Sequence, residues 1–235
     1  MKTKTNVLAV VSIAALFSLG YAIMRYNIFG SVPWKDLPLY IMNKAISFTA
    51  IILFTISYSI KYQNKPGTGI TQKSLDRRII IEITSSLIMV HVLMSLLLFK
   101  PAIFAKFFAA DGTISLYAGL SMIAGIMAFA LLWGYKLNSL SNKKNKKPLL
   151  SLHIVVNGAM LCTVTHLFFM GYKGWITPDK WNGGMPPISL VAFLIASFGL
   201  ILKLFRTFGR TAEPLETIMV ESGNQSAEEI NEFKN

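Results

Sequence analysis

The sequence contains six apolar runs of 15 to 24 residues, separated by short polar connectors. An α-helix needs about 20 mainly apolar residues to cross the hydrocarbon core of a bilayer. Runs of this length therefore favour transmembrane helices over the helices of a soluble domain. The runs cover residues 7–24, 39–60, 79–99, 113–135, 149–172 and 188–202. The sequence thus predicts an all-α fold, a six-helix transmembrane bundle that has the lipid bilayer as its surroundings.

Charge gives the predicted orientation of this bundle. The formal net charge is +12, which in a soluble protein would suggest binding to nucleic acid. Here the basic residues fall in the connectors, so we expect no nucleic-acid partner. Connectors on one side hold fifteen basic residues and those on the other side hold seven. The richer side is expected in the cytoplasm, which places both termini inside (N-in/C-in).

Two regions differ in composition. Residues 1–206 hold the six runs and form the predicted six-span transmembrane domain. Residues 207–235 contain six glutamates and are predicted to be an acidic cytoplasmic tail without fixed structure. The single cysteine, Cys162, excludes an intramolecular disulfide.

All three histidines of the chain lie in apolar runs, where an ionisable side chain is costly and points to a function. His91 is in the third run, and His153 and His166 are in the fifth. Both runs cross from the cytoplasm outward, and His91 and His166 fall at a similar depth. Two imidazoles at one depth can supply both axial ligands of a haem iron. His153, nearer the cytoplasm, would serve a second haem b.

Other interpretations of the histidines stay open. Each ring could instead hydrogen-bond a serine or a backbone carbonyl of a neighbouring helix. A zinc site would require carboxylate or thiolate ligands that the neighbouring sequence lacks. A proton relay would require an acidic residue in the membrane, and Glu82 is the one candidate.

Several residues near the ends or interfaces of the runs have two interpretations. Arg77 is expected to anchor the third helix at the headgroups, or to pair with a haem propionate near His153. Asn43 and Lys44 suit an interfacial position, because lysine can extend toward water. Gly119 and Gly125 are expected to allow close helix approach.

The six runs, His91 in the third, and Leu152-His153 followed by His166 in the fifth resemble the ferric reductase-like transmembrane domain family. The larger members carry two histidines in each of two helices, whereas here Arg77 stands fourteen residues before His91. This resembles the smaller bacterial branch, the haem-binding membrane subunits of methionine sulfoxide reductase systems. The resemblance implies that His91 and His166 bind one haem and that His153, with Arg77, lies near a second.

The resemblance and the histidines together predict a membrane b-type cytochrome of a bacterial plasma or inner membrane. The sequence has no GxGxxG motif for a dinucleotide, so electrons are expected from a separate cytoplasmic flavin reductase or from quinone. FMN or quinone is a further candidate cofactor. The acceptor on the far side would be a protein or a metal. The alternatives are a haem-free membrane protein for transport or complex assembly, and a terminal metal reductase.

Overall fold

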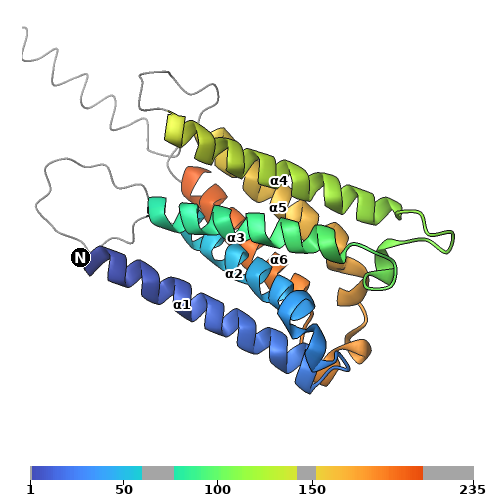
Figure 1. Cartoon of the computed structure of the whole chain (residues 1–235). Helices are drawn as coiled ribbons and strands as arrows, with labels where there is room; N and C mark the ends of the chain where they lie inside the picture. The colour runs from blue at the N-terminus through green and yellow to red at the C-terminus, as the bar shows by residue number, and fades with distance from the viewer. Residues whose placement is uncertain (1, 60–76, 142–151, 209–235) are drawn as a thin grey trace, which may run out of the picture. The chain divides into compact units, whose positions relative to one another are not determined.

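The computed structural model describes residues 2–59, 77–141 and 152–208. Over this part of the chain the structure is helical and contains no strand (Figure 1). Six of its helices are long and apolar enough to cross a membrane. They are α1 Lys2–Ile23, α2 Met42–Ser59, α3 Arg77–Leu98, α4 Leu116–Ser141, α5 Leu152–Trp175 and α6 Ile188–Phe208. The predicted all-α fold and the six apolar helices are confirmed, and the chain is a multi-pass membrane protein.

Several helices extend beyond the apolar runs that predicted them. Helix α4 continues to Ser141 and α6 continues to Phe208, six residues past the predicted end in each case. Hydropathy detects the part of a helix that lies in lipid. The backbone hydrogen bonds of a helix can continue through polar residues into the aqueous connector.

Two short π-helical turns flank the loop between α1 and α2, namely η1 Met24–Ile28 and η3 Leu37–Ile41. A π-turn is rare, and it often occurs at a functional site. The loop fits tightly against a distant segment at Gly30. A Cβ there would lie 2.5 Å from the Tyr26 carbonyl oxygen and 2.7 Å from Asn182 Nδ2. Glycine therefore lets this loop approach the segment before α6.

The main core lies where α2 meets α1, α5 and the first half of α6. Phe48 of α2 is fully buried there, together with Ala192 and Ala196 of α6. Helix α4 packs closely along α5, and α2 packs along α3. Many large apolar side chains point outward instead, such as Leu97 at 70% exposure and Phe198 at 62% exposure. This pattern is expected where the surrounding solvent is lipid.

The chain forms two compact units, Met1–Leu200 and Ile201–Asn235. All residues discussed below belong to the first unit. Of the second unit, residues 201–208 form the last turns of α6. The predicted acidic tail lies outside the described residues from position 209 onward, and so do most of the two basic connectors.

Candidate functional site

His91 and His166 occupy equivalent positions on α3 and α5. Each lies fourteen residues after the first residue of its helix, which is Arg77 in α3 and Leu152 in α5. At ~1.5 Å rise per residue, both rings are about 21 Å along their helices. The two imidazoles are close enough to interact electrostatically. Equal spacing is what a common depth in the bundle requires, and the common depth itself stays a prediction.

His166 is fixed by one residue of α4, Ser121. Its Nδ1 lies 2.7 Å from the backbone oxygen of Ser121 and 3.1 Å from the Ser121 hydroxyl oxygen. The same hydroxyl donates to the backbone oxygen of His166 at 3.0 Å. The side chain of Ser121 is 3% exposed. These contacts hold the ring on the line where α4 and α5 meet.

His91 is fixed by an amide from α2. Its Nδ1 lies 2.7 Å from Asn43 Oδ1. Asn43 Nδ2 donates to the Ser95 hydroxyl at 3.0 Å. Asn43 is 4% exposed. A contact between α2 and α3 thus buries the amide, and its interfacial depth stays a prediction.

These contacts select the same tautomer in both rings. The Ser121 carbonyl and Asn43 Oδ1 only accept hydrogen bonds, so Nδ1 of each ring must carry the proton and donate it. A neutral ring protonated at Nδ1 has its lone pair on Nε2. Nε2 of neither ring has a hydrogen-bond partner among the described residues. Both histidines are thus held with an unused lone pair available to a ligand.

Gly125 of α4 provides the space that the His166 ring occupies. A Cβ at Gly125 would lie 2.8 Å from His166 Nδ1 and 3.1 Å from His166 Cε1. The predicted close approach is confirmed at this glycine. At Gly119, on the same helix, a Cβ would meet no atom within 4 Å, so the prediction is wrong there.

Nδ1 of each ring makes a hydrogen-bond contact with a neighbouring helix, as the alternative interpretation of the histidines expects. Nε2 of each ring makes no such contact and could bind a metal. Metal-bound histidines usually donate their other N–H to a carbonyl or carboxylate oxygen, as these rings do. The described residues contain no group of three or more His, Cys, Asp or Glu side chains that could hold a bare metal ion. A haem requires only two axial ligands from the protein. The donor set at His91 and His166 therefore fits haem.

The second predicted haem site involves residues at the edge of the described part of the chain. Arg77 is the first residue of α3 and His153 is the second residue of α5. Arg77 thus lies at the start of the helix that carries His91, and His153 lies at the start of the helix that carries His166. Their side chains lie outside what the structure describes. A haem near His153 and a role for Arg77 stay predictions.

Three basic residues lie near the opposite ends of these helices. Lys44 Nζ is 4.5 Å from the Tyr40 ring centre and 5.6 Å from the Phe104 ring centre. Lys106 Nζ donates to the backbone oxygen of Met170 at 3.2 Å. Lys106 is exposed by surface area, but desolvation by the surrounding side chains, with the nearby charge of Lys44, lowers its pKa to about 8. The third basic residue, Arg25, is 6% exposed.

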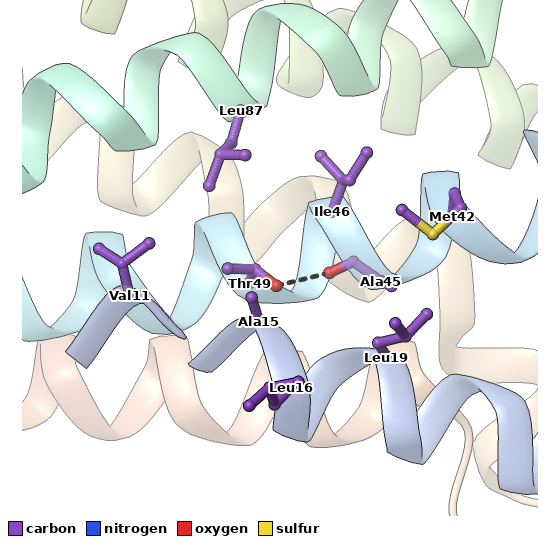
Figure 2. A pocket seen from close by; sticks show the side chains of 9 residues that line it. All are labelled: Val11, Ala15, Leu16, Leu19, Met42, Ala45, Ile46, Thr49 and Leu87. Atoms are coloured by element: carbon purple, nitrogen blue, oxygen red, sulfur yellow. Dashed lines mark hydrogen bonds between the residues drawn. The ribbon is translucent and has the colours of Figure 1, made fainter. Parts of the chain in front are cut away.

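A separate apolar hollow of about 180 Å³ lies between α1, α2 and α3 (Figure 2). Val11 and Leu16 of α1, Met42 of α2 and Leu87 of α3 are among its lining residues. The hydroxyl of Thr49, which also lines it, donates to the Ala45 backbone oxygen at 2.9 Å. With that hydroxyl used inside α2, the hollow suits a hydrocarbon chain better than a polar headgroup.

Sequence comparison adds no assignment to this geometry. No protein-family model matches the chain, and no curated protein matches it. The resemblance to the ferric reductase-like family therefore stays a prediction.

Proposed function

We propose that the protein is a membrane b-type cytochrome that passes electrons across the bilayer, with His91 and His166 as the axial ligands of a haem. The observation that supports this most is the matched contact of the two rings, because each Nδ1 lies 2.7 Å from an oxygen atom of a neighbouring helix. Nε2 of each ring has no hydrogen-bond partner among the described residues. A histidine with a purely structural role needs one hydrogen bond. Helix packing alone does not require that a second histidine uses the same ring nitrogen, Nδ1, for its hydrogen bond.

The residues around the histidines have distinct roles in this proposal. Ser121 and Asn43 orient the two rings and fix their protons on Nδ1. Because Ser121 and Asn43 accept a hydrogen bond from Nδ1–H, they also make each imidazole a better electron donor through Nε2. Gly125 leaves room for the His166 ring. Haem, when bound, supplies the one-electron redox chemistry that no side chain here offers.

Charge supports a direction for the electrons. The basic connectors predicted on the cytoplasmic side would attract an acidic flavin reductase, and quinol is the other candidate donor. The acceptor would be a protein or a metal on the far side. We place the protein in a bacterial plasma or inner membrane on the strength of the resemblance alone.

Reconstituted vesicles test the electron-carrier function. Haem-loaded protein is inserted into liposomes that contain trapped ferricyanide, and dithionite is added outside. We expect ferricyanide to be reduced faster than in protein-free vesicles and faster than in vesicles with His166→Ala. Haem-loaded wild type that reduces no more ferricyanide than empty vesicles would refute transmembrane transfer while leaving haem binding intact.

Replacing Asn43 with alanine tests the role of the hydrogen bond to His91. The His91 ring then loses the acceptor that fixes its tautomer, and we expect haem affinity to fall by about 10–100-fold. Ser47→Ala is the matched control, because the Ser47 hydroxyl donates only to the Lys44 backbone oxygen of its own helix. Haem titration of both variants gives the comparison. Equal affinities in the two variants would mean that Asn43 does not support a ligand.

A further inference from the structure

Arg25 is a buried cation without an anionic partner. It lies in the π-turn η1 and is 6% exposed. Its guanidinium shares a hydrogen bond with the Tyr26 side chain, and its Cζ is 5.6 Å from the Tyr26 ring centre. Its Nε and Nη1 have no hydrogen-bond partner among the residues that the structure describes. A buried charge with unused hydrogen-bond donors destabilises the fold unless an anion binds to it.

Lys44 and Lys106 extend this cationic group. Lys44 Nζ lies 5.0 Å from the same Tyr26 ring centre, so Tyr26 has a cation near it from each of two elements. The charges of Lys44 and Lys106 repel each other. None of the three cations forms an ion pair with a carboxylate in the described part of the chain. Three basic groups gathered without a counter-charge indicate a place for an anion.

This group also lies near the histidines. Lys44 follows Asn43, which holds His91, and the Lys44 charge acts on the His91 ring. The two π-turns η1 and η3 supply Arg25, Tyr26 and Tyr40 to the same region. The π-turns, the Arg25 donors and the proposed haem ligand His91 therefore lie in one region of the bundle.

We propose that Arg25 and Lys44 form a carboxylate-binding site beside His91. Guanidinium matches a carboxylate with two parallel N–H···O bonds, whereas lysine contributes a point charge. Two sources offer this chemistry: the propionates of the haem proposed above, and the carboxylate of a soluble ligand. The first source rests on the proposed function, whereas the second does not.

The first arm of the test compares haem with its dimethyl ester, which lacks both carboxylate charges. Purified haem-free protein in detergent is titrated with each, and binding is followed by visible absorption. If the propionates occupy the site, wild type prefers haem by about tenfold or more, equivalent to ~1.4 kcal/mol. Arg25→Gln and Lys44→Gln each reduce that preference. Lys35→Gln, which alters an exposed cation in the same loop, leaves it unchanged.

The second arm titrates haem-free protein with citrate by calorimetry. A soluble carboxylate as the ligand predicts saturable citrate binding that Arg25→Gln removes, with no preference for haem over its ester. A protein that binds neither haem nor its ester refutes the proposed function, and the citrate titration then decides the carboxylate site by itself. The carboxylate site is overturned if the wild-type protein binds haem and its dimethyl ester equally well and also binds no citrate.

One further variant, Arg25→Lys, and the Lys44→Gln variant already named protect the test against misfolding. Arg25→Lys keeps the charge and is expected to retain part of the carboxylate preference. Lys44→Gln changes a half-buried side chain and leaves the buried guanidinium in place. A symmetric peak in gel filtration is required of each variant. A preference that survives in both glutamine variants would show that the carboxylates bind elsewhere.

Discussion

Replacing His166 with alanine is expected to abolish the haem absorption of the purified protein. Loss of an outer-shell partner of a metal ligand typically costs about 10–100-fold in affinity, and loss of the ligand itself should cost more. His91→Ala is expected to have the same effect, since the two rings serve one iron in this account. Haem per chain, measured after gel filtration, gives the result for both variants.

Imidazole in the buffer separates a missing ligand from a damaged fold. The alanine variant has a space where the His166 ring was, and free imidazole can enter it and bind the iron. We therefore expect the haem spectrum to return in His166→Ala with imidazole. His153→Ala serves as the comparison and should leave this spectrum in place. Wild-type spectra in both His91→Ala and His166→Ala would mean that the ligand pair is wrong.

Gly125→Ala is expected to disrupt the site although it replaces neither of the two proposed ligands. The new methyl group would lie 2.8 Å from His166 Nδ1, a ring nitrogen that is already held 2.7 Å from the Ser121 oxygen. The ring must move away, because the helix backbone fixes the methyl group. Overpacking of this kind typically costs about 1–3 kcal/mol. Thermal unfolding in detergent and haem titration should both show the loss.

Gly119→Ala is the matched control on the same helix. A Cβ at Gly119 meets nothing within 4 Å, and alanine is a better helix former than glycine by about 0.5–1 kcal/mol. We expect this variant to be as stable as wild type or more stable, with unchanged haem affinity. If Gly125→Ala behaves like Gly119→Ala, the His166 ring does not lie against α4 as described.

The depth of the histidines could be predicted from the sequence, because the rise per residue along a helix is constant. Residue counts from the cytoplasmic ends of two parallel helices place His91 and His166 at one level. In the structure both residues lie fourteen positions after the first described residue of their helices, and their common depth stays a prediction. This inference depends only on spacing within each helix.

The partners of the histidines could not be predicted in the same way. Asn43 reaches His91 across 48 positions of sequence, and Ser121 reaches His166 across 45. Such contacts depend on which faces of two helices meet. In the sequence, Asn43 beside Lys44 has the appearance of an interfacial pair, and one helix alone cannot show that the amide is buried.

Arg25 illustrates a related limit. A basic residue at the end of an apolar run is a normal marker of topology, and the charge count used it as one. The structure adds the π-turn that contains Arg25 and the burial of its guanidinium. A π-turn has no simple sequence signature, so the unpaired cation becomes visible only in three dimensions.

The central claim is that this protein binds a b-type haem through His91 and His166. The most direct test is a dithionite-reduced minus oxidised visible spectrum of the purified wild-type protein, with haem and protein quantified in the same sample. The account predicts a shifted Soret band and an α band on reduction, with at least one haem per chain. Protein supplied with haem during expression that shows neither band would contradict it.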